Sequence, residues 1–341
     1  MLKEGNKLDV CFLSHLLNQN SCYLYGVSLD VILQITYFLE ARKMSTTLET
    51  DILAKKRLHL VRGIPITTHF KQEFVEETLD YEPRDGDVII TSYPKTGTTW
   101  ISYIVLQILT NGESFPNKDE MLYRTIPFME STGKAAVDAI TTNPRVYKHH
   151  FPYGKIKKNP NAKYIYIYRK PEDTFVSYYH FLRYNSEELD FDQYFEDFLS
   201  GEISYGLYFD HVLSFLKHKE DSNMLLISYE SLKENTREEI KKISKFLGEE
   251  YYKNITENEE ILDKIILHTS FDYMKRRLVD EAKKDAPSSN NESARDASHF
   301  FRKGVVGEGK KSLKADQLQR LRKLTEERMK ETEVLLEWTW E

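Results

Sequence analysis

Buried strands alternate with amphipathic helices along the middle of the chain. Residues Val88–Ile90, Lys163–Tyr168 and Met224–Ser228 are short runs rich in β-branched, aromatic and other apolar side chains, a composition typical of strands covered on both faces. Segments in which apolar residues recur at helical spacing separate these runs. The pattern predicts an α/β domain with a central parallel sheet and helices on both faces of that sheet.

The helices are expected from the period of the apolar positions and from proline and glycine near the helix ends. One follows Trp100, one begins at Pro171, and the later ones are Leu232–Leu247, closed by Gly248, Ile261–Arg277 and Ala315 to about Leu336. Residues Asn111–Gly133 are expected to be mostly loop. Residues Ala282–Ser298 have a low-complexity composition and are expected to form a mobile loop.

The turn after the first strand is a candidate anion site. It is punctuated by Pro94 and Gly97, and a helix follows. Thr96 to Thr99 therefore lie at a helix N-terminus, where free backbone N–H groups and the helix dipole favour an anion. Lys95 adds a positive charge, but it precedes the glycine, whereas the usual phosphate loop has its lysine after the second glycine. The turn is thus an oxyanion cradle of another kind, with a plain surface turn as the simpler alternative.

A further short strand ends near Pro152 and carries Lys148 and His150 at its carboxyl end, where ligands bind in open α/β sheets. Because side chains alternate along a strand, Lys148 and His150 are expected to share a face, and His149 to point the other way. A histidine pair is more often a surface or metal feature. No further cluster of histidine and acidic residues with metal-ligand spacing accompanies this pair, so no metal is expected.

Composition limits the possible partners and compartment. The 341 residues, 40% of them hydrophobic, suit one large domain or two small ones. The net charge of −6 gives no general reason to expect nucleic acid or an anionic membrane as a partner, so an anion site has to be built locally. The two cysteines, Cys11 and Cys22, are too few for a disulfide framework, and the cytoplasm is the expected location.

The first 43 residues differ from the rest. Val10–Leu29 lacks charge but contains several polar side chains, and the apolar run Val31–Leu39 is short, so neither makes a good membrane span. No clear signal peptide is present. We interpret residues 1–43 as an extension before a single domain, 44–341, and Met44 would serve as a start. A membrane anchor is the alternative.

Three motifs resemble the signatures of the cytosolic sulfotransferases. They are Tyr93–Trp100, Arg169–Phe181 and the Arg-Lys-Gly-x-x-Gly pattern of Arg302–Gly307. Lys148–Pro152 is also similar to that family's Lys-Thr-His-Leu-Pro, with His149 in place of threonine. The resemblance covers about residue 58 to the C-terminus. It implies the sulfotransferase fold, related to nucleotide kinases, and transfer of a sulfuryl group from 3′-phosphoadenosine 5′-phosphosulfate (PAPS) to a hydroxyl or amine of a small molecule.

The resemblance also implies roles for individual residues. His150 matches the family's catalytic histidine, while Lys95 and Lys148 would neutralise charge that develops during transfer. Arg169 offers a bidentate fork, and Ser177 a hydroxyl, to the 3′-phosphate. No metal is implied, because lysine and arginine can meet the charge of the donor. The residues implied to bind the donor are Lys95, Thr96, Gly97, Thr98, Thr99, Trp100, Arg169, Ser177, Tyr229, Thr269, Phe271, Arg302, Lys303 and Gly304.

The acceptor and the oligomeric state stay open. Phenols, steroids, alcohols and amines are all candidate acceptors, and Ile126–Met129 is equally a core segment or part of the acceptor pocket. Glu308-Gly309 stands where the family usually has Asp-Trp, and Lys314-Ala315 and Gln319 replace residues of its dimer motif. We therefore expect a monomer, or a dimer that uses another surface. A catalytically weak PAPS-binding protein and a membrane-anchored sulfotransferase are the alternatives. A nucleotide kinase is not expected, because the sequence contains neither the usual phosphate loop nor a recognisable magnesium ligand.

Overall fold

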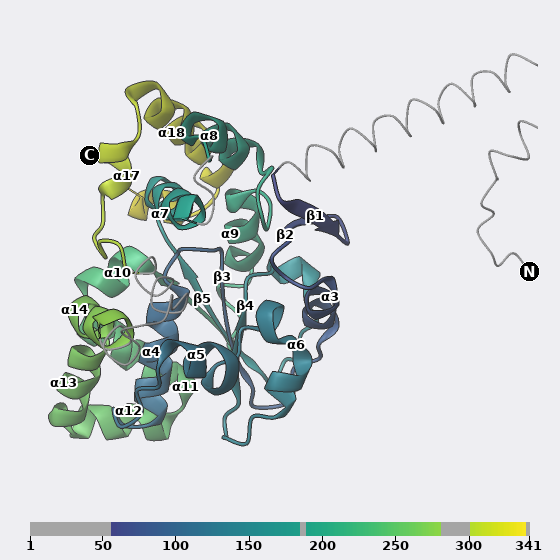
Figure 1. Cartoon of the computed structure of the whole chain (residues 1–341). Helices are drawn as coiled ribbons and strands as arrows, with labels where there is room; N and C mark the ends of the chain where they lie inside the picture. The colour runs from purple at the N-terminus through teal and green to yellow at the C-terminus, as the bar shows by residue number, and fades with distance from the viewer. Residues whose placement is uncertain (1–55, 185–188, 281–300, 339–341) are drawn as a thin grey trace, which may run out of the picture. The chain divides into compact units, whose positions relative to one another are not determined.

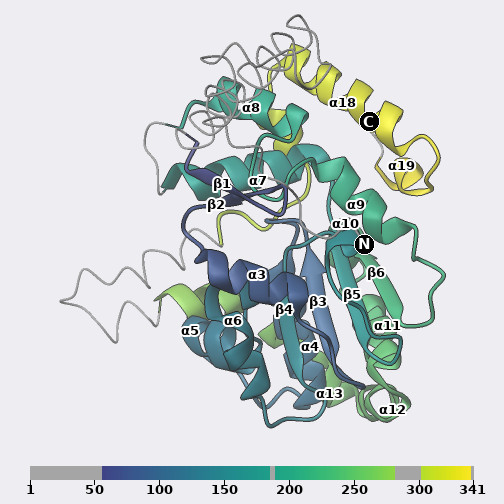
Figure 2. The ribbon, with the colours of Figure 1, turned by 90° about the vertical axis from the view of Figure 1, so that its right-hand side faces the viewer.

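The parallel sheet predicted from the apolar runs is present. The computed structural model describes residues 56–184, 189–280 and 301–338. Its main sheet contains β3 (Val88–Ser92), β4 (Val146–His149), β5 (Lys163–Tyr168) and β6 (Met224–Ser228). Neighbouring strands pair in parallel in the order β4-β3-β5-β6, and Figure 2 shows them side by side.

Helices cover both faces of this sheet, as Figure 1 shows for α4 and α11 on one side and α3 and α6 on the other. A separate two-stranded sheet contains β1 (Leu58–Val61) and β2 (Ile64–Thr67). The helical elements up to β6 are α3 (Gln72–Asp80), α4 (Thr98–Leu109), α5 (Lys118–Glu120), the π-helical turn η2 (Met121–Thr125), α6 (Met129–Asp138), the 3₁₀ turn η3 (Tyr153–Lys155), α7 (Pro171–Tyr184), α8 (Phe191–Ser200) and α9 (Tyr208–Leu216). Those after β6 are α10 (Tyr229–Glu234), α11 (Thr236–Leu247), α12 (Glu249–Glu257), α13 (Glu259–His268), α14 (Phe271–Lys275), the π-helical turn η4 (Arg276–Asp280), α17 (Glu308–Ser312), α18 (Ala315–Met329) and α19 (Val334–Glu337).

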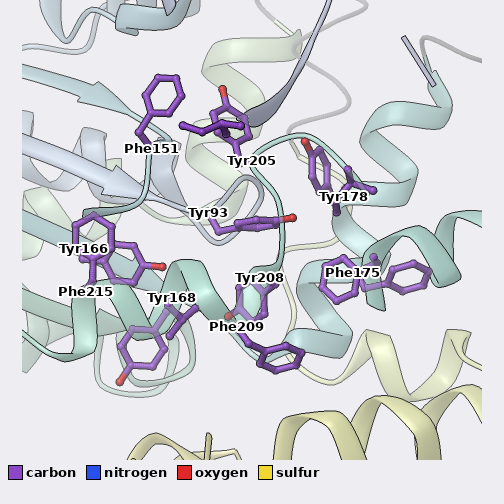
Figure 3. Packing of buried hydrophobic residues seen from close by; sticks show 14 of the residues in the cluster. Tyr93, Phe151, Tyr166, Tyr168, Phe175, Tyr178, Tyr205, Tyr208, Phe209 and Phe215 are labelled. Atoms are coloured by element: carbon purple, nitrogen blue, oxygen red, sulfur yellow. The ribbon is translucent and has the colours of Figure 1, made fainter. Parts of the chain in front are cut away.

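Alternation along β5 divides the core into two clusters. Tyr164, Tyr166 and Tyr168 face the cluster that α7, α8 and α9 help to form, whereas Ile165 and Ile167 face the cluster with α4, α11 and α13. The period of two in the strand sequence produces this division, because successive side chains point to opposite faces. On the tyrosine side the rings of Tyr166 and Phe215 stack with centroids 4.0 Å apart (Figure 3). Both faces of the strand are therefore buried, as its composition predicted.

The order of the strands creates a switch point between β3 and β5. From β3 the chain continues to β4 on one side, and from β5 it continues to β6 on the other side. In open α/β sheets, such a point leaves a crevice at the carboxyl ends of the two strands. The turn at 93–97 follows β3 and Arg169 follows β5, so both motifs reach this crevice.

Three predicted helices are each interrupted. The helix expected over Leu232–Leu247 is divided at Asn235 into α10 and α11, and the helix expected over Ile261–Arg277 is divided at Thr269-Ser270. Ser270 caps α14 by accepting the N–H of Tyr273, which favours a helix start over continuation. The helix expected from Ala315 to Leu336 is likewise divided into α18 and α19. The spacing of apolar residues in the sequence did not reveal these breaks.

The segment Asn111–Gly133 is less irregular than expected. It contains α5, the turn η2 and the first residues of α6. These elements are short, and α6 is kinked at Gly133, whose φ is 67°. A helix of one or two turns contains too few apolar positions to show a period, so the prediction of a mostly irregular segment was wrong.

By compactness the chain divides into two units, Met1–His59 and Leu60–Glu341, and the main sheet lies in the second. The predictions for residues 1–43 and for the loop Ala282–Ser298 fall outside the described residues. Within 56–184, 189–280 and 301–338, no helix is long and apolar enough to cross a membrane.

Candidate active site

The turn after β3 begins α4 with its backbone close to β5 and to the start of α10. Gly97 is the N-cap of α4, and its φ is 118°, a left-handed conformation that favours glycine. A Cβ atom at Gly97 would lie 2.9 Å from both Ile167 and the ring of Tyr229. The glycine therefore allows a close approach that brings the N-terminus of α4, with its free N–H groups, to the crevice.

The threonines of the turn have different tasks. Thr96 is fully buried, and its hydroxyl lies 2.8 Å from the carbonyl oxygen of Tyr93 and 3.0 Å from that of Ile167. Its side chain thus ties the turn to β5, and only its backbone N–H can serve a ligand. The hydroxyl of Thr98 lies 2.5 Å from that of Ser92. Lys95 Nζ lies 4.2 Å from the centroid of the Phe181 ring, so a cation is held at this turn.

Lys148 and His150 come from the end of β4, next to the end of β3. Lys148 pairs with Ile90, and His149 pairs with Thr91. The Nδ1 atom of His150 lies 2.7 Å from the carbonyl oxygen of Ser92, whereas His149 Nδ1 lies 3.1 Å from the backbone nitrogen of Phe151. The two imidazoles therefore have separate surroundings.

Burial and nearby cations alter the acid–base behaviour of this pair. Burial, together with the charges of Lys148 and Lys95, lowers the pKa of His150 to about 3, although the hydrogen bond to Ser92 opposes the shift. Burial also lowers the pKa of Lys148 to about 7, against the opposing charge of Glu130. The imidazole is therefore neutral near pH 7 and able to accept a proton.

A second group of cations lies after β5. The guanidinium of Arg169 lies over the ring of Tyr229, 4.2 Å from its centroid, and donates to the carbonyl oxygen of Val305 at 2.9 Å. Asp173 lies 3.4 Å from Arg169 and accepts the backbone N–H groups of Gly307 at 2.8 Å and Gly309 at 2.6 Å. Asp173 thus connects the second motif, Arg169–Phe181, to the third motif, Arg302–Gly307, by hydrogen bonds.

The third motif presents its basic residues beside Glu308. Lys303 pairs with Glu308, and Arg302 lies 3.8 Å from the same carboxylate. A Cβ at Gly304 would lie 2.2 Å from the ring of Phe271. The backbone of Gly304 therefore packs directly on that ring. Gly304 and Phe271 are thereby brought together from segments far apart in the sequence.

Three buried polar atoms support a fit to an anionic nucleotide. Among the described residues, Lys148 Nζ, Arg169 Nε and Trp100 Nε1 have no hydrogen-bond partner. Buried donors normally have a partner, and an unpaired buried cation is especially costly. Trp100 lies in the first turn of α4, Lys148 at the end of β4 and Arg169 directly after β5, so the three atoms come from the three parts of the site. Their chemistry fits a ligand with several negative charges and a polar ring.

One of the expected donor-binding residues offers less than its side chain suggests. Thr269 is buried, and its hydroxyl donates to the carbonyl oxygen of Ile265 at 2.8 Å. Ser177 lies on α7, two turns beyond Arg169, and is partly buried.

Sequence reasoning missed Glu130 and the role of Asp173. Glu130 is fully buried and accepts the backbone N–H of His150 at 2.6 Å. A charged residue directly after the apolar segment Ile126–Met129 was the available signal. Asp173 lies inside the motif Arg169–Phe181, but no signal in the sequence indicated its contacts with the third motif. In the described part of the chain, no three His, Cys, Asp or Glu residues are grouped to hold a metal ion.

An anion cradle after one strand and a lysine–histidine pair after its neighbour define a class of group-transfer enzymes that act on a highly charged donor. The sulfotransferase domain family matches residues 85–333. The chain therefore belongs to the sulfotransferase family, and the resemblance to cytosolic sulfotransferases that the three motifs indicated is confirmed. It is a sulfotransferase by family and by fold.

Individual relatives and structures agree with this assignment. The chain is 36% identical over 269 residues to sulfotransferase 1B1 of Canis lupus familiaris, covering 75% of this chain and 87% of the relative. It is 31% identical over 274 residues to the amine sulfotransferase of Oryctolagus cuniculus, covering 78% and 88%. Mouse sulfotransferase SULT7A1, solved in complex with PAP, aligns with a TM-score of 0.63 at 29% identity, over 81% of this chain and 95% of that one. Retinol dehydratase, at 21% identity, a TM-score of 0.64 and coverage of 84% and 95%, shares the fold.

Proposed function

We propose that this chain transfers the sulfuryl group of PAPS to a hydroxyl or amine of a small molecule, with His150 as the general base. When bound, PAPS supplies an activated sulfuryl group and a phosphate as leaving group. The proposal rests above all on Lys148: its Nζ is buried without a partner among the described residues, two positions before His150. A buried cation of this kind is explained by an anion that binds beside the histidine.

His150 would accept the proton of the attacking group at Nε2. Its Nδ1 faces the carbonyl oxygen of Ser92 at 2.7 Å, and a carbonyl can only accept, so Nδ1 carries the ring proton. Burial is the main cause that lowers the pKa of this histidine, and the charges of His211, Lys148 and Lys95 add to it. An anion beside the two lysines would offset those charges and strengthen the base.

Lys95 and Lys148 would stabilise negative charge that develops during transfer, together with the N–H groups of Thr96 to Thr99. Arg169, Ser177, Arg302, Lys303 and Gly304 would hold the 3′-phosphate. Trp100, Tyr229, Thr269 and Phe271 would surround the nucleotide base. The PAP complex of the mouse relative supports the binding of such a nucleotide by this fold.

The acceptor is proposed only as a class: a phenol, steroid, alcohol or amine. Phe70 contacts Phe128 edge to face at 5.6 Å, and Phe128 contacts the His150 ring at 5.0 Å. Tyr205 also contacts that imidazole, with ring centroids 5.5 Å apart. An apolar acceptor with one hydroxyl or amine suits such aromatic surroundings.

The test is transfer from radiolabelled PAPS to a panel of phenols, steroids, aliphatic alcohols and amines. We expect a labelled product with at least one class, and loss of that product in the Lys148→Ala variant. As a control, the exposed Lys323→Ala variant should transfer as the original chain does. Tight PAP binding without transfer to any acceptor would favour a catalytically weak PAPS-binding protein.

We further propose that residues 44–341 form a single sulfotransferase domain, that residues 1–43 are an extension, and that the protein acts in the cytoplasm. A chain beginning at Met44 should then keep its solubility and activity, and cell fractionation should recover the full chain apart from membranes. Because the family's dimer motif is altered at Lys314-Ala315 and Gln319, we propose a monomer, or a dimer through another surface, which sedimentation at micromolar concentration tests.

A further inference from the structure

The segment that precedes α6 extends the hydrogen bonding of β4 at the catalytic edge. The backbone N–H of Lys148 donates to the carbonyl oxygen of Pro127 at 2.9 Å, and Phe128 forms a parallel bridge with Lys148. A strand at this position would offer a further carbonyl to the N–H of His150 two residues later. Helix α6 begins at Met129 instead, so the backbone cannot supply that acceptor.

The side chain of Glu130 takes the place of the missing carbonyl. Its Oε1 accepts the N–H of His150 at 2.6 Å and the hydroxyl of Tyr205 at 3.3 Å. Glu130 is fully buried, and in the described part of the chain its Oε2 has no hydrogen-bond partner. The charged group that acts on it from β4 is Lys148.

The N–H that Glu130 accepts belongs to the residue whose ring is proposed to act as base. That ring is hydrogen-bonded at Nδ1 to the carbonyl oxygen of Ser92 and contacts the rings of Phe128, at 5.0 Å, and Tyr205, at 5.5 Å. Glu130 is bonded to one of these neighbours, Tyr205, as well as to the His150 backbone. The His150 backbone and one ring beside its imidazole are therefore both hydrogen-bonded to the carboxyl group of Glu130.

We propose that Glu130 is a positioning residue for the reaction: by accepting the N–H of His150, it holds the imidazole in the direction in which Nε2 meets the acceptor. This inference rests on the proposed role of His150 as base. Geometry of this kind matters because small displacements of a catalytic group cost a large part of the rate.

Two substitutions separate the role of Glu130 as a hydrogen-bond acceptor from any role of its charge. Burial raises the pKa of Glu130 to about 8, so the carboxyl is largely protonated at neutral pH, and glutamine has nearly the same shape. Glu130→Gln keeps an oxygen for the N–H of His150 but cannot ionise. Glu130→Asp keeps an ionisable carboxyl but is shorter by one methylene, so its oxygens withdraw from the N–H.

The experiment compares these two variants with the original chain. We expect Glu130→Gln to keep kcat within about threefold, and Glu130→Asp to lower kcat about tenfold or more, with the affinity for PAP unchanged in both. Val137→Ala, a buried change on the same helix, is the matched control: it should reduce stability but not kcat at a temperature well below unfolding. An unchanged kcat in Glu130→Asp, or an equal loss in Glu130→Gln, would overturn the proposal.

A second measurement keeps this test independent of the proposed function. NMR of histidine-labelled protein, with the His150 signal assigned through a His150→Gln variant, reports the surroundings of the imidazole. The signal should move in Glu130→Asp and stay in place in Glu130→Gln and Val137→Ala. If the His150 signal does not move in Glu130→Asp, the positioning role is contradicted, whether or not the original chain transfers a sulfuryl group. If the signal moves but the original chain transfers no sulfuryl group, only the proposed function is contradicted.

Discussion

The carbonyl oxygen of Ser92, the last residue of β3, lies 2.7 Å from Nδ1 of His150, the residue after β4. Because this oxygen can only accept a hydrogen bond, it selects the tautomer with a lone pair on Nε2. Two adjacent strand ends thus determine which nitrogen of His150 can act as a base. At His149 the same nitrogen, Nδ1, instead accepts the backbone N–H of Phe151 at 3.1 Å.

The first prediction concerns these two histidines. His150→Ala should lower kcat by about a hundredfold or more, the usual effect of losing a general base. PAP affinity should stay near normal. His149→Ala should mainly reduce stability, since its ring is buried in the core. Steady-state rates and PAP titrations measure both effects, and a His150→Ala variant with near-full turnover of a phenol at neutral pH would disprove the assignment.

The second prediction concerns recognition of the 3′-phosphate. Arg169→Ala should weaken binding of PAP by about tenfold or more, the cost of a lost charge-assisted hydrogen bond. Binding of the analogue that lacks the 3′-phosphate should change much less. Calorimetry with both ligands measures the difference. Arg322→Ala, an exposed change on α18, is the control and should alter neither affinity; equal losses for both ligands in Arg169→Ala would refute the role.

The third prediction concerns Gly309, which stands where the family usually has tryptophan. A Cβ at Gly309 would lie 2.3 Å from the carbonyl carbon of Glu172, so Gly309→Ala should force the third motif away from α7. We expect a loss of about 1–3 kcal/mol in the free energy of unfolding, as for other overpacked sites, together with weaker PAP binding. Gly154→Ala is the matched control, because a Cβ there meets nothing within 4 Å. If urea unfolding gives equal stabilities for the two variants, the steric account is wrong.

The fourth prediction concerns the pH dependence of stability. Burial raises the pKa of Glu130 from 4.5 to about 8, so the folded chain holds a proton that the unfolded chain releases. The resulting stabilisation is fully present below about pH 4.5 and is lost as the pH rises through about 8. Glu130→Gln should therefore gain in unfolding free energy relative to the original chain across this range, by at most about 1.4 kcal/mol per pH unit.

Denaturant unfolding between pH 5 and pH 8.5 measures this gain. The exposed Glu326→Gln variant controls for loss of a surface carboxylate, and its difference from the original chain should not depend on pH to a similar extent. A difference between Glu130→Gln and the original chain that is constant with pH would mean that Glu130 titrates normally.

The sequence predicted the parts of this fold that depend on local patterns. The alternation Lys163–Tyr168 specifies a strand buried on both faces, and β5 has these same bounds. The cradle could be predicted because a strand, a glycine turn and a helix are contiguous in the chain. The interruptions at Asn235 and Ser270 were not predicted; at Ser270 the side chain caps a new helix by accepting the N–H of Tyr273.

The motifs alone defined the family, since each is a short run of residues whose chemistry requires their spacing. Only the tertiary structure decided how the motifs meet. Asp173 on α7 holds the amides of Gly307 and Gly309, and Glu130 on α6 holds the amide of His150. These contacts join residues that are 20 to 136 positions apart. No periodicity encodes such pairs, because the position of a helix relative to a strand end is set by packing of the whole core.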